Sequence, residues 1–384
     1  MPYQTQVNVR LLSVYFVCLL LFFEASAQKS NLTHIVFTSD LHFGLNRNSF
    51  RRNTQVTSYA VNAEMLKAMA GLVNSQLPTD GKIGSGEKIT SISALIIAGD
   101  IVNRQEIGIQ SARKSWDEFA SLYLSKSLIP TQKKQPQIFL LPGNHDVSNM
   151  VGYHKPMDPL LDSSSYFGIY RFMFPDSNQV TKINYPQNRI HYSKDVSGIH
   201  FVFLNLWPDS AERKWMDEDL SRLDSSTPVV LFAHSFPDVE ARFFINPNTD
   251  HSVKSKDKFE NLLSEAFKDG LQVSDTSKLE QHAFAEFVRR HPTIKAYFHG
   301  HSNYTEFYTW QGPNGECSLP CIRVDSPLKG KISSKEEKIL SFELISINQV
   351  NQTLVIRECL WNTNWQINKK SSIVFGKSFQ LNLY

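Results

Sequence analysis

The stretch Gln137-Ile-Phe-Leu-Leu-Pro-Gly-Asn-His-Asp146 is the most informative segment of this 384-residue chain. Its first five residues form a short apolar run that ends at proline and glycine, which is typical of a buried strand. Gly143 lets the chain bend sharply away from that strand. The next three residues then place an amide, an imidazole and a carboxylate at its carboxyl end. The stretch therefore predicts a buried strand with polar side chains gathered at its end.

Four further apolar runs end in residues of the same kind. They are 33–38 before Asp40 and His42, 93–98 before Gly99-Asp100, 229–233 before His234, and 294–298 before His299-Gly300-His301. Ligands of open α/β sheets gather at the carboxyl ends of the strands. Carboxylate, amide and imidazole groups together suit two hard or borderline cations. Each fragment alone is also an ordinary turn or strand cap, but five of them in one chain predict a metal site with two ions.

The first of these fragments is expected to continue its strand. Side chains two positions apart on a strand point to the same face of the sheet. Asp40 and His42 are therefore predicted to face the metal site together.

Strand patterns and helix patterns alternate along the chain. Apolar residues recur with helical spacing over 58–76, 111–126 and 277–290, and a further buried strand is predicted over 200–205. This alternation is typical of βαβ units and a parallel sheet. From residue 340 the apolar residues alternate on both sides of a turn, which predicts an antiparallel hairpin over about 340–361. Residues 149–190 fit neither pattern.

The amino-terminal residues have the pattern of a secretory leader. Arg10 precedes an apolar run over 11–23 and the small-residue cleavage site Ala25-Ser26-Ala27. The run is shorter than the roughly 20 residues that cross a bilayer. We therefore predict a signal peptide over 1–27, cleaved after Ala27, and a secreted or periplasmic protein of residues 28–384 with no stable membrane span. An uncleaved anchor is the alternative.

Composition and charge limit the class of partner. Hydrophobic residues make up 41% of the chain and charged residues 20%, which is typical of a globular protein with a packed core. The formal net charge is only +3 and no long basic run occurs, so a nucleic-acid partner is not expected. Cys18 would leave with the leader. Cys317 and Cys321 either form a disulfide across three residues or remain free thiols together with Cys359.

The polar fragments resemble the motif set of the calcineurin-like metallophosphoesterase superfamily, whose pattern is D-x-H, G-D, G-N-H-[DE], a lone His and G-H-x-H. The matching residues run from Asp40 to about Asn303. The resemblance implies an α/β (α+β) fold, a four-layer αββα sandwich in which helices flank two mixed β-sheets, completed by the hairpin at about 340–361. It also implies an exported enzyme with two divalent or trivalent ions (Fe, Mn or Zn), whose bridging hydroxide hydrolyses a phosphomonoester or a phosphodiester.

The resemblance assigns a role to each motif residue. Asp40 and His42 bind the first ion, Asp100 bridges the two ions, Asn144 and His234 bind the second ion, and His145 contacts the phosphate and assists the leaving oxygen with help from Asp146. The last motif has two alignments. Aligning its glycine puts His301 on the second ion and Asn303 on the first, whereas aligning its histidines puts His299 on the second ion and His301 on the first. We favour the glycine alignment because the turn needs Gly300. It predicts looser binding of the first ion, since an amide is a weaker ligand than an imidazole.

The implied substrate is a small phosphate ester, such as a nucleotide or a phospholipid head group. Tyr153, His154 and Arg242 are candidate substrate-binding residues because their segments are expected to line the cleft. Two alternatives stay open. One is a non-catalytic exported protein that binds a metal or a ligand and has lost first-ion affinity through Asn303. The other is a nuclease.

Overall fold

The computed structural model describes residues 32–103, 110–124, 127–146, 163–176, 180–181, 183, 187–239, 267–268, 271–272, 277–366 and 373–383. The predicted leader over 1–27 lies outside these residues, as do Tyr153, His154 and Arg242. None of the helices in the described part of the chain is both long and apolar enough to cross a membrane.

The first sheet contains three of the predicted buried strands and the predicted hairpin. Its order is β16-β15-β14-β1-β4-β5, with β1 Leu32–Thr38, β4 Ala94–Ala98, β5 Gln137–Leu141, β14 Ser341–Asn348, β15 Thr353–Leu360 and β16 Val374–Asn382. β1, β4 and β5 are parallel neighbours, whereas β14, β15 and β16 add antiparallel pairs. The sheet is therefore mixed, and the hairpin over about 340–361 is confirmed as β14 and β15.

The second sheet is mixed as well. Its order is β12-β13-β11-β8-β7-β6, with β6 Tyr192–Val196, β7 Ile199–Phe203, β8 Val229–Phe232, β11 Ile294–His299, β12 Glu306–Trp310 and β13 Leu319–Arg323. The four central strands are parallel, and β6 and β12 pair antiparallel at the two edges. Smaller elements are the pairs β2 Asn46–Phe50 with β3 Asn53–Thr57 and β9 Phe267–Lys268 with β10 Leu271–Gln272, and the short 3₁₀ helix η2 Glu337–Ile339.

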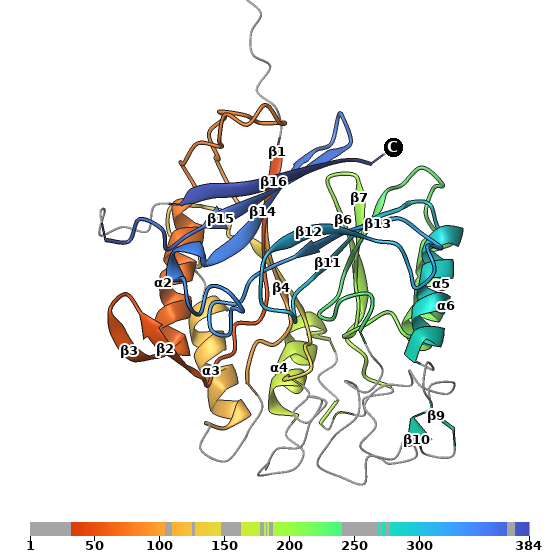
Figure 1. Cartoon of the computed structure of the whole chain (residues 1–384), viewed down its shortest axis with the longest axis horizontal. Helices are drawn as coiled ribbons and strands as arrows, with labels where there is room; N and C mark the ends of the chain where they lie inside the picture. The colour runs from red at the N-terminus through yellow and green to blue at the C-terminus, as the bar shows by residue number, and fades with distance from the viewer. Residues whose placement is uncertain are drawn as a thin grey trace, which may run out of the picture.

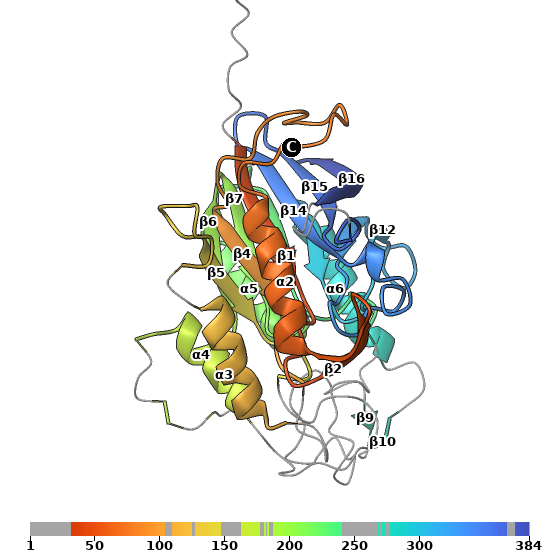
Figure 2. The same cartoon turned by 90° about the vertical axis from the view of Figure 1, so that its left-hand side faces the viewer.

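Helices cover the outer face of each sheet and complete the predicted four layers (Figures 1 and 2). α2 Ser58–Gly71, α3 Ala112–Tyr123 and α4 Ser164–Met173 lie on one side, and α5 Ser210–Leu220 and α6 Ser277–Arg290 on the other. Hydroxyl or carboxylate N-caps start three of these helices, since Thr57, Ser111 and Asp209 each accept a hydrogen bond from a backbone N–H group of the first turn.

The sequence prediction extended the first helix too far. α2 ends at Gly71 rather than at residue 76, because the chain beyond it turns to pair with residues 87–89. α4 lies within residues 149–190, where no periodic pattern was found.

Aromatic side chains fill the space between the two sheets. The ring of Phe37 on β1 lies 5.3 Å from that of Phe298 on β11 and 5.9 Å from that of Phe232 on β8, between centroids. Phe139 on β5 contacts Phe203 on β7 at 5.1 Å. Burying a side chain of this size stabilises a fold by about 1.5–3 kcal/mol. These contacts bring the carboxyl ends of both sets of parallel strands to one place.

The three described cysteines are free thiols, which confirms the unpaired alternative. Cys321 is buried on β13, so the segment between Cys317 and Cys321 leads into a strand and does not form an isolated loop.

Candidate metal centre

Backbone hydrogen bonds join the predicted strand ends to one another. Asp40 N donates to Gly99 O at 3.0 Å, and Gly300 N donates to His234 O at 3.0 Å. His234 Nδ1 lies 2.8 Å from Ala98 O, which connects the second sheet to the first. A carbonyl oxygen only accepts, so Nδ1 of His234 carries the proton and Nε2 is left as a possible metal ligand.

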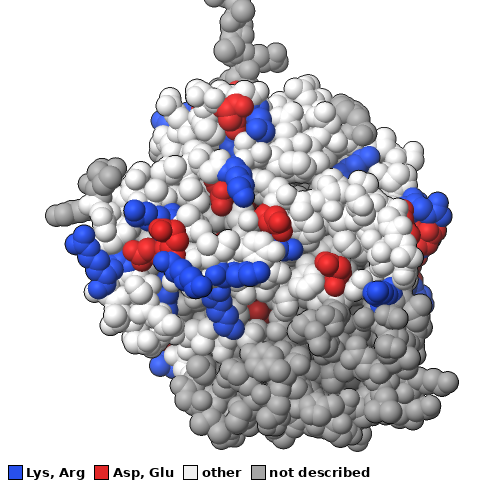
Figure 3. Space-filling view, in the orientation of Figure 1, with Lys and Arg blue, Asp and Glu red and all other residues white. Residues whose placement is uncertain are grey.

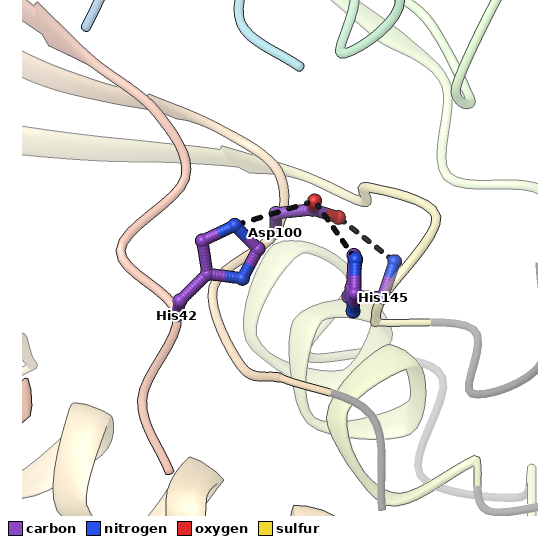
Figure 4. Close-up of side chains that lie close together, drawn as sticks. All are labelled: His42, Asp100 and His145. Carbon is purple, nitrogen blue, oxygen red and sulfur yellow. Dashed lines mark hydrogen bonds and ion pairs between the residues drawn. The ribbon is translucent and has the colours of Figure 1, made fainter. Parts of the chain in front are cut away.

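The first group of candidate ligands contains His42, Asp100 and His145 (Figure 4). His42 Nε2 lies 3.6 Å from Asp40 Oδ1 and 3.7 Å from Asp100 Oδ2. Both ring nitrogens of His42 and Oδ1 of Asp40 are buried without a hydrogen-bond partner. Buried polar atoms without partners are uncommon and call for an explanation. A cation between these atoms would satisfy His42 Nε2 and Asp40 Oδ1 together, so the residues fit a metal ion.

Asp40 and His42 do face one site, but not for the predicted reason. β1 ends at Thr38, and the two residues have φ angles of 56° and 45°, in the left-handed region. Hydrogen bonds to the loop after β4 fix this conformation, because His42 N donates to Asp100 O at 3.0 Å. The expectation of an extended strand through His42 is therefore wrong. The left-handed residues curl the chain, and this curl brings the two side chains together.

The second group contains Asp100, His234 and His301, with Asn144 beside them. Asn144 Oδ1 lies 3.0 Å from His234 Nε2 and 3.0 Å from His301 Nδ1, and these two nitrogens are 3.1 Å apart. Ligands at about 2.0–2.1 Å from one ion stand about 3 Å from each other. The three atoms thus have the mutual spacing of ligands that share an ion.

Asp100 belongs to both groups. Its Oδ2 atom is 3.7 Å from His42 Nε2 and 3.4 Å from His234 Nε2. Burial alone would raise the pKa of Asp100, but the charges of His234 and His145 hold it well below its usual value. Burial alone would lower the pKa of His234, but Asp100 and Asp40 raise it to about 9. Without a metal, the centre therefore holds a carboxylate and an imidazolium in contact.

The structure places one of the two histidines of the last motif in a described ligand group. His301 lies in the second group, whereas His299 Nε2 lies 2.8 Å from Tyr308 Oη and its Nδ1 lies 3.0 Å from Gly300 O. A Cβ atom on Gly300 would come within 2.0 Å of Ser39 Oγ, so the turn accepts only glycine. Asn303 Oδ1 is buried without a hydrogen-bond partner, as are Oδ1 of Asp40 and the two ring nitrogens of His42.

The neighbouring residues His145 and Asp146 contact different parts of the structure. His145 N donates to Asp100 Oδ1 at 2.8 Å, which holds the residue beside the first group. The carboxylate of Asp146 accepts hydrogen bonds from four donors: Gly143 N at 2.8 Å, Ile101 N at 3.2 Å, Val102 N at 3.1 Å and Ser165 Oγ at 2.7 Å. None of these described donors belongs to the ring of His145. Through these hydrogen bonds Asp146 ties the loops after β4 and β5 together.

The structure adds one residue that the sequence analysis missed. Lys329 Nζ lies 3.3 Å from His145 Nε2 and donates to Asn103 Oδ1 at 3.1 Å. Lys329 lies beyond the last matching motif residue and belongs to no motif or periodic pattern. Nothing in a single sequence indicated that this lysine reaches the centre.

Comparisons with known proteins give the following matches. A family model described as calcineurin-like phosphoesterase matches residues 33–304. The calcineurin-like phosphoesterase YfkN from Bacillus subtilis is 12% identical, covering 92% of this chain and 91% of that chain, with a TM-score of 0.31. The phosphopantetheinyl hydrolase PptH from Mycobacterium tuberculosis is 14% identical, covering 78% and 91%, with a TM-score of 0.32. Vps29 from Entamoeba histolytica, in complex with zinc, is 8% identical, covering 92% and 100%, with a TM-score of 0.32. No curated protein matches the sequence.

Proposed function

Because this chain belongs to the calcineurin-like phosphoesterase family, we propose that it is a hydrolase of phosphate esters that uses two metal ions. The position of Asp100 carries the proposal. One oxygen of this buried carboxylate approaches a ring nitrogen of His42 at 3.7 Å and one of His234 at 3.4 Å. A carboxylate in contact with both ligand groups is suited to bridge two ions.

Each ion would have its own set of ligands. The first would be held by Asp40, His42, Asp100 and Asn303, and the second by Asp100, Asn144, His234 and His301. This mixture of oxygen and nitrogen donors suits iron, manganese or zinc. Such ions polarise phosphoryl oxygens and lower the pKa of water so that hydroxide is available at neutral pH.

His145 is the proposed catalytic residue of the chain itself. Its backbone is fixed to Asp100, and its ring packs edge-on against the ring of His42 with centroids 5.0 Å apart. From this position its ring can contact the phosphate and give a proton to the leaving oxygen. Asp146 supports this role indirectly, because it holds the loop that carries His145.

A small substrate is favoured over a nucleic acid. The formal net charge is only +3, and on the face shown in Figure 3 lysine and arginine side chains gather in one group at the left while acidic ones are spread between the others. Binding to a nucleic-acid backbone relies on clustered basic residues. Export after cleavage of residues 1–27 belongs to the same proposal and rests on the sequence pattern of the leader. Mass spectrometry of the mature protein would test it, with Gln28 expected as the first residue.

The proposal is tested with a panel of metals and substrates. Metal-stripped protein is reloaded separately with iron, manganese and zinc and assayed against monoesters, cyclic nucleotides and phospholipid head groups. Metal-dependent turnover of at least one ester is expected. Absence of turnover with every metal would overturn the proposal in favour of a non-catalytic binding protein.

A further inference from the structure

Lys329 is held inside the centre by a short turn after β13. Ser326 Oγ accepts a hydrogen bond from Lys329 N at 2.9 Å and donates one to Asp40 O at 2.8 Å. One hydroxyl thus joins the backbone of the lysine to the loop that carries a first-ion ligand. The ammonium group donates to Asn103 Oδ1, and Asn103 is itself fixed by a bond from its N–H group to Phe43 O at 2.8 Å. Lys329 is therefore positioned by the fold at both ends of its side chain.

The ammonium group lies where a phosphate is expected. Its Nζ atom is 3.3 Å from Nε2 of His145, the residue proposed to contact the phosphate. A phosphoryl oxygen placed between the two groups would receive a hydrogen bond from each of them. A hydrogen bond to an ionised group is about twice as strong as one between neutral groups.

We propose that Lys329 makes this centre selective for the dianion of a phosphate monoester over the monoanion of a diester. The inference rests on the proposed function and names the substrate class of the same site. A monoester offers an unsubstituted, charged oxygen to Lys329 and His145. A diester carries a second organic group and one negative charge fewer.

The balance of charges in the centre supports this selectivity. A monoester dianion carries one negative charge more than a diester monoanion. Lys329 adds one positive charge to the centre, beyond the charges of the ions and of a protonated His145. In a site where the groups are buried, an uncompensated charge is costly. The charge of Lys329 therefore favours the monoester over the diester.

The test compares Lys329→Met with Lys329→Arg, which keeps the charge, and with Lys331→Met on the same loop. The side chain of Lys331 lies over the ring of Tyr304, 4.9 Å from its centroid. Its backbone N–H group donates to Asn303 O at 2.6 Å, a bond that the change to methionine keeps. For each protein, kcat/KM is measured with p-nitrophenyl phosphate and with bis(p-nitrophenyl) phosphate. The Kd values of orthophosphate and dimethyl phosphate are measured by calorimetry, and bound metal by mass spectrometry.

Lys329→Met is expected to lose about 100-fold in kcat/KM for the monoester and in orthophosphate affinity. Its kcat/KM for the diester and its Kd for dimethyl phosphate should stay within about threefold of wild type, and its metal content should be unchanged. Lys329→Arg should restore part of the loss, and Lys331→Met should behave as wild type. Equal losses for both substrates, or an unchanged orthophosphate Kd, would overturn the proposal. Lys329→Gln repeats the test if Lys329→Met does not fold.

If the protein is not a phosphate-ester hydrolase, the experiment gives a different result, because wild-type protein then hydrolyses neither substrate with any metal. The two Kd values still decide the role of Lys329 in that case, because its selectivity for orthophosphate over dimethyl phosphate does not depend on turnover.

Discussion

Nδ1 of His301 lies 3.1 Å from Nε2 of His234, although the two residues are 67 positions apart in the chain. Both nitrogens are also 3.0 Å from Oδ1 of Asn144. Gly300 makes this approach possible, because its N–H group bonds to His234 O and a side chain at this position would collide with Ser39 and Asp40. Three ligand atoms from the loops after β5, β8 and β11 thus lie within about 3 Å of one another.

His301→Ala should remove about one equivalent of metal, since it deletes one of these three ligands. His299→Ala is the matched control from the same turn. It should keep the full metal content and lose about 1–3 kcal/mol in the free energy of unfolding, because the hydroxyl of Tyr308 loses its buried partner. Metal content is measured by mass spectrometry and stability by urea unfolding. Loss of metal in His299→Ala would instead support the histidine alignment of the last motif.

Asn303→His should tighten binding of the first ion by at least about tenfold, because an imidazole replaces an amide. The residue has a φ angle of 59°, a conformation that histidine adopts more readily than most residues. Equilibrium dialysis against a series of free zinc concentrations measures the change. Asn303→Leu is the control and should lose the first equivalent. Identical affinities in all three proteins would show that residue 303 is not a ligand.

Metal uptake should release about one proton from the ligands of the protein at pH 7, in addition to any proton that metal-bound water loses. Asp100 and Asp40 raise the pKa of His234 to about 9, so its ring is protonated in the metal-free protein and must lose a proton before it binds an ion. Burial and the charge of His234 lower the pKa of His301 to about 4, so His301 contributes none. Metal affinity should thus rise up to tenfold per pH unit and level off near pH 9. Calorimetry in buffers of different ionisation enthalpy counts the protons, and a count of zero would contradict the assignment of His234.

The free energy of unfolding should decrease in acid because of His34, which lies on β1 away from the metal centre. Burial, with a smaller contribution from the charge of Arg357, lowers the pKa of His34 to about 4. Between pH 6.5 and pH 4 the unfolded chain binds the extra proton, so the free energy of unfolding decreases by about 3 kcal/mol over this range. His34→Gln should show a shallower decrease between pH 7 and pH 4.

His200 provides a control of opposite sign. Burial alone would lower its pKa, but hydrogen bonds to Asp219 and Asp195 raise it. The contribution of His200 to the free energy of unfolding is present below pH 6.5 and is lost as the pH rises through its elevated pKa. His200→Gln should therefore lose stability mainly on the acid side. If the free energy of unfolding depends on pH in both variants as it does in wild type, the pKa values of His34 and His200 are not shifted.

Strands buried on both faces were predictable because such strands are nearly continuous apolar runs. β1, β4, β5, β8 and β11 follow this rule, and each delivers a ligand at its carboxyl end. The partly exposed β16 alternates too weakly to be recognised. The hairpin of β14 and β15 was visible because both strands alternate around a short turn.

The parts of the site that could not be predicted depend on contacts between distant segments. Asp146 follows His145 directly in the sequence, but its oxygens close on backbone N–H groups of the β4 loop. Lys329 reaches His145 only because Ser326 bonds to Asp40, far back along the chain. Neither contact has a local sequence pattern. The left-handed residues at Asp40 and His42 likewise arise from hydrogen bonds to the loop after β4.

Asp100→Ala tests the central claim most directly, because Asp100 is the one carboxylate in both described ligand groups. Asp117→Ala, at an exposed helix carboxylate paired with Arg113, is the control. Bound metal and hydrolysis of bis(p-nitrophenyl) phosphate and p-nitrophenyl phosphate are measured on the same preparations. Wild type and the control should hold two equivalents of metal and hydrolyse at least one ester, whereas Asp100→Ala should lose at least one equivalent and all turnover. Full activity in Asp100→Ala with both ions retained would contradict the account.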